Sequence, residues 1–223
     1  MTRLNLKLAA PLCTVFAIAA FCVLPPLAAA GDATSGGGAG FADPVVSAPK
    51  GAFAGKSSTI TGHVAPGSGQ VSIEARLGQG PWTAVATAST DAAGDFTITW
   101  KPFKAGRYDF RITPTDTAIA SSNQEQGPLS VYRRQKATWY GPGFYGHRTA
   151  CNIKLTRRTL GVAHRSLPCG SKVEFFNAGR KVTVPVIDRG PYVHGVTWDL
   201  TLATARALGT SDTVILGALP LPQ

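Results

Sequence analysis

The chain has 223 residues, and its 22 Lys and Arg against 12 Asp and Glu give a formal net charge of +10. Hydrophobic residues make up 44% of the chain and charged residues 15%, which excludes a protein disordered throughout and leaves room for two small domains. No run of Lys and Arg interleaved with aromatic residues marks a nucleic-acid groove, so we expect no nucleic acid as a partner.

Residues 1–30 have the pattern of a secretory signal peptide. Arg3 and Lys7 precede an apolar run, and small residues then supply a cleavage site near Ala30. The alternative is an uncleaved membrane anchor, but prolines leave the run short of the ~20 apolar residues that span a bilayer. Neither cysteine of this segment follows a small residue, so a lipid anchor is not expected. We expect a secreted protein, extracellular or associated with the cell wall, whose positive charge favours anionic wall polymers or lipid head groups, or serves solubility alone.

Residues 31–43 are rich in Gly, Ala and Ser and predict a flexible linker. Residues 44–135 then alternate apolar and polar side chains in short runs, and the turn residues 91–94 predict a hairpin. The pattern predicts an antiparallel immunoglobulin-like β-sandwich. Its strands are expected at residues 58–65, 70–77, 82–89, 95–100, 107–113 and 129–133.

The segments around Trp82, Gly94 and Tyr108 resemble the immunoglobulin-like modules appended to many secreted bacterial proteins, which implies a role in spacing or surface attachment. Trp82, Trp100 and Tyr108 are candidates for a platform that stacks on sugar rings. Core packing is the favoured interpretation, because such sandwiches need aromatic side chains in their interior.

Residues 137–223 differ in character, because a Gly-rich segment at 139–146 precedes strand-like runs at 172–176 and 181–187. A short helix is predicted at about 201–208: Asp199 or Thr201 can cap its start, and Gly209 can end it. These elements predict a small mixed barrel with a short helix, so that the whole protein is mainly β.

Acidic residues are scarce in this segment, which restricts any acid chemistry to a few groups. Asp188 and Asp199 lie on a strand-turn-strand unit, and Asp188 follows an apolar strand that would hold its carboxyl at the barrel rim. The alternative is that Asp188 only caps the turn that follows it. The acids of the segment are Glu174, Asp188, Asp199 and Asp212.

Cys151 and Cys169 lie close in sequence and predict one disulfide in an exported protein. Such a crosslink stabilises the fold by about 3 kcal/mol. The alternative is a cysteine nucleophile paired with His164, which an oxidising compartment disfavours. A zinc site built from His147, His164 and His194 is a further alternative, but no closely spaced histidine pair supports it, so we expect no metal.

Five short motifs carry the strongest family signal. They are Trp139-Tyr140-Gly141, Gly146-His147-Arg148-Thr149-Ala150, Ala163-His164-Arg165-Ser166-Leu167-Pro168-Cys169-Gly170, Asp188-Arg189-Gly190-Pro191 and Trp198-Asp199-Leu200. In order and spacing they resemble the double-psi β-barrel domain of the rare lipoprotein A family, whose members include septal-ring lytic transglycosylases of peptidoglycan. The resemblance covers residues 137–223 and implies a six-stranded barrel with a groove for a glycan strand of alternating N-acetylglucosamine and N-acetylmuramic acid.

The resemblance also implies an activity, which is cleavage of the β-1,4 bond without water to leave a 1,6-anhydro sugar end. No cofactor is expected. Peptidoglycan glycan strands are the expected partner, cell-division or wall-synthesis proteins are further candidates, and the oligomeric state is left open.

The chemistry needs a proton donor for the leaving oxygen and a base for the C6 hydroxyl, and one carboxyl can serve both steps. The resemblance assigns this role to Asp188, with His164 in support as a sugar contact, an orienting group or a proton shuttle. The alternative for His164 is a satisfied core histidine. Tyr140, Arg189 and Asp199 are expected to contact substrate, and for Asp199 the alternative is a structural role at the helix start.

The chain departs from the family at one position. Where relatives carry Thr-Ala-Asn-Gly-Glu, with a glutamate thought to contribute to activity, this sequence has Ile153 in place of the glutamate. An isoleucine can neither donate nor accept a proton. This departure favours the alternative function, a non-catalytic module that binds or loosens wall glycans as expansins do.

Overall fold

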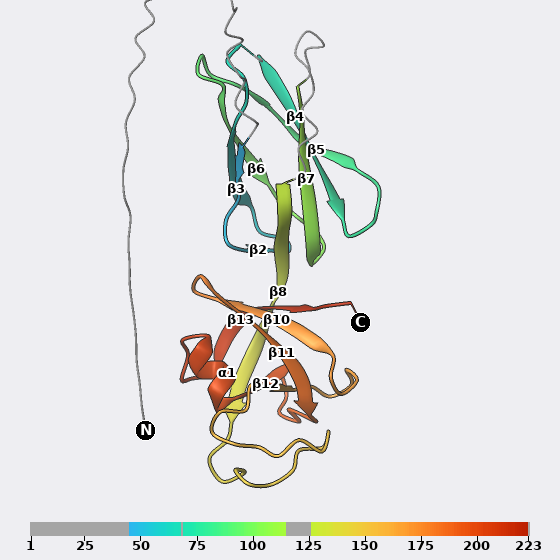
Figure 1. Cartoon of the computed structure of the whole chain (residues 1–223), viewed down its shortest axis with the longest axis vertical. Helices are drawn as coiled ribbons and strands as arrows, with labels where there is room; N and C mark the ends of the chain where they lie inside the picture. Colours follow the sequence, from blue (N-terminus) through green and yellow to red (C-terminus); the bar gives the residue numbers. More distant parts are fainter. Residues whose placement is uncertain (1–44, 68, 115–125, 223) are drawn as a thin grey trace, which may run out of the picture. The chain divides into compact units, whose positions relative to one another are not determined.

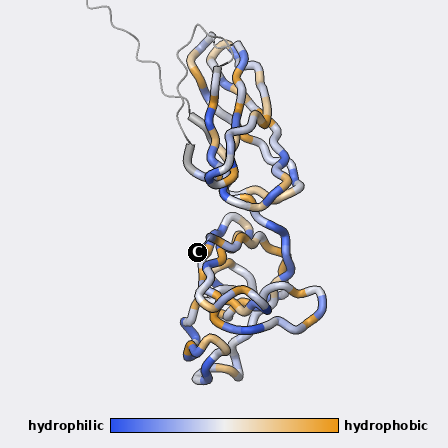
Figure 2. The backbone as a smooth tube through the Cα atoms, turned by 90° about the vertical axis from the view of Figure 1, so that its right-hand side faces the viewer, coloured by the Kyte–Doolittle hydropathy of each residue, from blue (hydrophilic) through white to orange (hydrophobic). Residues whose placement is uncertain are grey.

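The computed structural model describes residues 45–67, 69–114 and 126–222 (Figure 1). The expected signal peptide and linker, residues 1–30 and 31–43, lie outside these ranges. The described chain is mainly β with one short helix, as predicted. Within these ranges no helix is long and apolar enough to cross a bilayer. Hydrophobic and hydrophilic positions are interspersed along the strands, as half-buried sheets require (Figure 2).

Two sheets share one core in the first part of the described chain. Core side chains come from both sheets, with Ile60 and Ile98 on one and Ile73 and Ile112 on the other. The strand order of the first sheet is β1 (Val45–Ser47), β3 (Ser58–His63), β6 (Asp95–Trp100). The strand order of the second sheet is β5 (Thr83–Ser89), β4 (Gln70–Leu77), β7 (Gly106–Pro114), β8 (Gln126–Tyr140), and β2 (Ala52–Phe53) pairs with β8. Alternate residues of β4 are buried, as predicted, while the assignment to the immunoglobulin-like type stays a prediction.

Residues 91–94 form a turn, but the predicted hairpin is wrong. The Asp91 carboxylate accepts hydrogen bonds from the backbone N–H of Ala93 (2.9 Å) and Asp95 (2.8 Å). Gly94 has a φ of 98°, and a Cβ there would collide with the carbonyl oxygen of Val64. The flanking strands β5 and β6 pair with β4 and β3 in different sheets, so the turn carries the chain from one sheet to the other.

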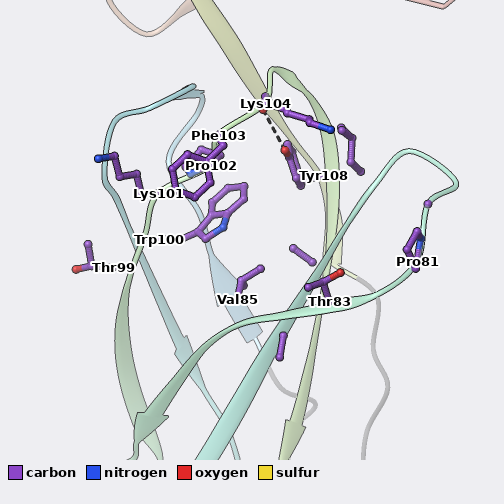
Figure 3. A pocket seen from close by; sticks show the side chains of 14 residues that line it. Pro81, Thr83, Val85, Thr99, Trp100, Lys101, Pro102, Phe103, Lys104 and Tyr108 are labelled. Carbon is purple, nitrogen blue, oxygen red and sulfur yellow. Dashed lines mark hydrogen bonds between the residues drawn. The ribbon is translucent and has the colours of Figure 1, made fainter.

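The aromatic residues of this part serve packing. Trp100 is 5% exposed, and its ring meets that of Tyr108 edge-on at 5.0 Å. The ring of Trp82 lies 4.6 Å from the guanidinium carbon of Arg76 and 4.7 Å from that of Arg111, so cations cover it. Figure 3 shows Trp100 and Tyr108 at a hollow of about 710 Å³. Its lining contains no Asp, Glu, His or Cys.

The second part is a closed barrel. Its strand order is β8, β13 (Val214–Pro220), β10 (Lys172–Asn177), β11 (Arg180–Asp188), β9 (Val162–Ala163) and β12 (Trp198–Thr201), and β12 pairs again with β8. The β12–β8 and β11–β9 pairs are parallel, and the other four are antiparallel. The predicted six-stranded barrel is confirmed. Strand β8 pairs with β7 before Tyr132 and with β13 from Arg133 onward, so one strand serves both parts of the chain.

Helix α1 (Leu202–Ala207) follows β12 directly. Its N-cap is Thr201, whose hydroxyl accepts a hydrogen bond from the backbone N–H of Thr204 at 3.2 Å. Asp199 lies inside β12 and does not cap the helix, so the capping role offered for it is wrong. The Thr204 hydroxyl also exchanges two hydrogen bonds of 2.9 Å with the backbone of Gly161, which fixes the helix against the segment before β9.

Glu174 is a buried carboxylate on β10, only 4% exposed. Its Oε1 accepts a hydrogen bond from the Tyr132 hydroxyl at 2.7 Å, and Arg107 (3.1 Å) and Lys181 (3.8 Å) lie at ion-pair distance. Burial alone would raise the pKa of Glu174. The hydrogen bonds from Ser130 and Tyr132 and the charges of the two cations outweigh burial and bring the pKa below its ordinary value.

We predict that Glu174→Gln lowers the free energy of unfolding at neutral pH by about 2 kcal/mol, the scale of hydrogen bonds to a charged group. A carboxylate with a lowered folded pKa stabilises the fold above its unfolded pKa and loses that contribution as the pH falls through the folded pKa. Below pH 4.5 the wild type should therefore lose stability more steeply than the variant. Urea unfolding across this range measures both slopes, and equal slopes would contradict the prediction.

Candidate active site

Asp188 ends β11, at a point where three segments of the barrel meet. Its Oδ1 accepts hydrogen bonds from the backbone N–H of Ala150 (2.9 Å) and of Arg189 (2.8 Å). The backbone N–H of His164 donates to the carbonyl of Asp188 at 3.2 Å. The side chain is half-buried, and no donor of the described ranges reaches Oδ2 in normal hydrogen-bond geometry. Asp188 thus has one oxygen fixed by the backbone, partly as the predicted turn cap, and one available to a ligand.

Tyr140, at the end of β8, has a buried hydroxyl with no hydrogen-bond partner of normal geometry among the described residues. Burial is the main cause that raises the pKa of Tyr140. The charges of Asp188 and Asp199 and a long contact with the Asp188 carboxylate raise it further. The phenol therefore keeps its proton and lies near the Asp188 carboxylate without a hydrogen bond of normal geometry. A buried hydroxyl without a partner costs about 1–3 kcal/mol.

Asp199 is the second carboxylate of the site. Its register in β12 places it beside Thr138 of β8, whose hydroxyl donates to its Oδ1 at 2.8 Å. Burial raises the pKa of Asp199, the hydrogen bond from Thr138 lowers it in part, and the charge of Asp188 raises it again. The pKa of Asp199 is thus raised overall, and the charge of Asp188 is one of the causes. The two aspartates therefore influence each other electrostatically.

His164 lies at the end of β9 and packs its ring 4.5 Å from that of Trp198. Its Nδ1 accepts hydrogen bonds from the backbone N–H of Leu167 (3.0 Å) and Ser166 (3.2 Å), which assigns the ring proton to Nε2. Burial, and then the charges of Arg165 and Arg189, lower the pKa of His164. A neutral ring with Nδ1 occupied is poorly suited to the proton-shuttle role, whereas its Nε2–H can donate to a sugar oxygen.

The Arg189 guanidinium organises the loop of residues 164–169. It donates to the carbonyl oxygens of Leu167 (3.0 Å) and His164 (3.5 Å) and to the Cys169 sulfur (3.4 Å). Within the described ranges it forms no ion pair with the Asp188 carboxylate. The substrate contact expected of Arg189 stays a prediction, while these contacts make it a positioning residue.

Arg165 has an equivalent role that sequence reasoning missed. Its guanidinium donates to the carbonyl oxygens of Pro191 (2.6 Å), Val193 (3.0 Å) and Val196 (2.7 Å), which fixes the loop between Asp188 and β12. The residue lies inside the histidine motif, but nothing in the sequence distinguishes it from a solvent-exposed arginine.

The disulfide between Cys151 and Cys169 is present, with the two Cα atoms 5.7 Å apart. It joins the loop of residues 149–153 to the loop of residues 164–169, both of which contact Asp188. A free thiol nucleophile is therefore excluded at these positions. Ile153 lies in the first loop and is 43% exposed, at the position where the family resemblance places a glutamate.

No group of three or more His, Cys, Asp and Glu in the described ranges is arranged to hold a metal ion. The zinc alternative drawn from the three histidines therefore finds no ligand set in this part of the chain.

Comparison with known proteins points to one family. Residues 133–217 match the family DPBB_1, described as Lytic transglycolase. The chain is 48% identical over 80 residues to a probable endolytic peptidoglycan transglycosylase RlpA of Aquifex aeolicus, covering 35% of each chain. It is 45% identical over 75 residues to a probable RlpA of Synechocystis (33% of this chain, 23% of the relative). It is 38% identical over 87 residues to the endolytic peptidoglycan transglycosylase RlpA of Campylobacter jejuni (38% and 30%).

The chain thus spans about a third or less of the length of these relatives. The matched residues lie in the barrel. Together with the closed ring of six strands, this match confirms the predicted double-psi β-barrel of the rare lipoprotein A type.

We predict that replacing both cysteines by serine lowers the free energy of unfolding by about 3 kcal/mol, because the reduced chain regains loop entropy. The same change should loosen the Ala150 N–H that holds Asp188, so amide hydrogen exchange at Ala150 should accelerate more than exchange in the β4 strand. Thiol titration of unfolded, unreduced residues 31–223, whose cysteines are Cys151 and Cys169, provides the control. Two reactive thiols there would contradict the crosslink.

Proposed function

We propose that this chain, whose residues 133–217 form a double-psi β-barrel of the lytic transglycolase family, is a secreted lytic transglycosylase of peptidoglycan. It cleaves the β-1,4 bond between N-acetylmuramic acid and N-acetylglucosamine and leaves 1,6-anhydro-N-acetylmuramic acid ends. The observation that carries the proposal is the Asp188 carboxyl, held at Oδ1 by two backbone amides and open at Oδ2, beside the buried phenol of Tyr140.

In this mechanism Asp188 acts twice. Protonated at Oδ2, it gives its proton to the glycosidic oxygen as the C1–O4 bond breaks, and the amides on Oδ1 stabilise the carboxylate that remains. The carboxylate then removes the proton of the C6 hydroxyl, whose oxygen bonds to C1 and closes the anhydro ring. The proton returns to Asp188, so the cycle consumes no water.

Two further groups can orient the sugar. The Tyr140 hydroxyl and the Nε2–H of His164 are donors that keep their protons at neutral pH, and the only protein acceptor described for either is the Asp188 carboxylate, at long range from Tyr140. A glycan offers acetamido and hydroxyl oxygens as acceptors. The roles of these two residues are thus hydrogen bonding and positioning, and the role of general acid stays with Asp188.

The charge of the barrel suits an anionic glycan. From Arg133 to Gln223, 13 Lys and Arg stand against 4 Asp and Glu, so this part of the chain carries nearly all of the net positive charge. Peptidoglycan bears carboxylates on its muramyl residues or stem peptides, and a field of this sign raises its local concentration.

A second candidate is the non-catalytic module that binds or loosens wall glycans. The observation in its favour is Ile153, an exposed apolar side chain where relatives place a carboxyl. In the proposed mechanism Asp188 performs both proton transfers, so that second carboxyl is not required.

We predict that the full chain releases soluble fragments with 1,6-anhydro ends from purified peptidoglycan and that Asp188→Asn lowers the rate by about 10²–10⁴-fold, the contribution of general acid–base catalysis. The side-chain oxygen of Asn can still accept the two backbone N–H groups, so the fold should persist. Asp212→Asn, at an exposed carboxylate outside the site, is the matched control. Mass spectrometry of the products provides the readout, and a wild type that pellets with the wall but releases nothing would favour the second candidate.

We predict that Tyr140→Phe lowers this rate by about tenfold or more, because one donor to the substrate is lost. The same change should leave the melting temperature equal or higher, since the hydroxyl has no partner in the free protein. Parallel thermal unfolding and product assays separate the two effects. A drop in both quantities would indicate that the hydroxyl is structural.

A further inference from the structure

A hollow of about 310 Å³ in the barrel part of the chain takes no part in the mechanism above. It is formed by the Gly-rich loop after β8, the segment before β9 and helix α1. Its lining residues are Pro142, Gly143, Tyr145, Arg157, Leu202 and Arg206. Both arginines are exposed, and within the described ranges neither forms an ion pair with a carboxylate.

The first lining residue of the hollow, Pro142, lies two residues after Tyr140. Gly141 is buried against it, because a Cβ at this position would meet the Tyr145 hydroxyl at 2.7 Å and the Leu202 Cβ at 3.2 Å. The loop turns back through a hydrogen bond of 2.9 Å from the Phe144 N–H to the Gly141 carbonyl, and the exposed Phe144 ring lies edge-on to that of Tyr140 at 6.2 Å. The same loop therefore carries Tyr140 at its start and lines the hollow that holds the two arginines.

We propose that Arg157 and Arg206 form a carboxylate subsite for the muramyl residue of the bound glycan. The proposal rests on the proposed function, because it names which part of that substrate the hollow receives. Guanidinium groups bind carboxylates with paired, charge-assisted hydrogen bonds, and two that converge on one hollow select a carboxylate over a neutral sugar substituent. The carboxylate is either the lactyl group that a peptide-stripped strand exposes or a carboxyl of an attached stem peptide.

The chain offers a matched control in Arg158. It is exposed like its neighbour Arg157 and carries the same charge, but it does not line the hollow. Variants at the two positions therefore change net charge equally and differ only in the proposed subsite.

The test measures retention of the full chain on intact peptidoglycan, on peptidoglycan freed of stem peptides, and on chitin as a neutral β-1,4 glycan. We expect Arg157→Gln and Arg206→Gln each to weaken binding to at least one carboxylate-bearing glycan by about tenfold, the scale of one charge-assisted pair. Binding to chitin should be unchanged, and Arg158→Gln should match the wild type throughout. Loss on stripped strands alone identifies the lactyl group, and loss on intact strands alone identifies the stem peptide.

Equal losses in Arg157→Gln and Arg158→Gln would show that only net charge matters and would overturn the subsite, as would unchanged binding in both arginine variants. The outcome is separable from that of the proposed function. Selective loss of binding without any anhydro product in the wild type would retain the subsite and reject the lytic activity. Anhydro product with unaffected arginine variants would do the reverse.

Discussion

The site depends on the pair of hydrogen bonds that Asp188 Oδ1 accepts from the backbone N–H groups of Ala150 and Arg189. These bonds tie the end of β11 to a loop that lies 38 residues earlier in the chain. The Cys151–Cys169 disulfide, together with the guanidinium of Arg189, holds that loop and the histidine loop in place. Because Oδ1 is committed to the backbone, only Oδ2 remains for chemistry, and its direction is fixed by covalent and hydrogen-bonded structure rather than by a second acid.

The environment gives similar groups different roles. The Asp188 carboxylate accepts hydrogen bonds from two backbone N–H groups, whereas the Asp199 carboxylate accepts one from the Thr138 hydroxyl. Burial raises the pKa of Asp199. Burial, and then the charges of both aspartates, raise the pKa of Tyr140, while burial, and then the charges of Arg165 and Arg189, lower the pKa of His164. A barrel with few acids can thus supply one carboxyl for proton transfer and two neutral donors for binding, without the glutamate whose place Ile153 takes.

The sequence predicted long elements and motif-bearing residues better than short strands and unpaired atoms. The ranges 70–77 and 95–100 were predicted with the observed bounds, because each alternates over six or more residues between turn signals. Strand β9 has two residues and shows no period, so only tertiary pairing defines it. The disulfide followed from two cysteines in one domain. The buried hydroxyl of Tyr140 and the hydrogen bonds from Arg165 to three carbonyl oxygens depend on packing between distant segments, which no local sequence pattern encodes.

In the proposed mechanism, Asp188 drives cleavage by the sugar's own C6 hydroxyl and not by water. Digestion of purified peptidoglycan by the full chain in water labelled with heavy oxygen, followed by mass spectrometry of the soluble products, distinguishes the two. Attack by the C6 hydroxyl leaves 1,6-anhydro-N-acetylmuramic acid ends that carry no label. Labelled reducing ends would show hydrolysis and contradict the mechanism.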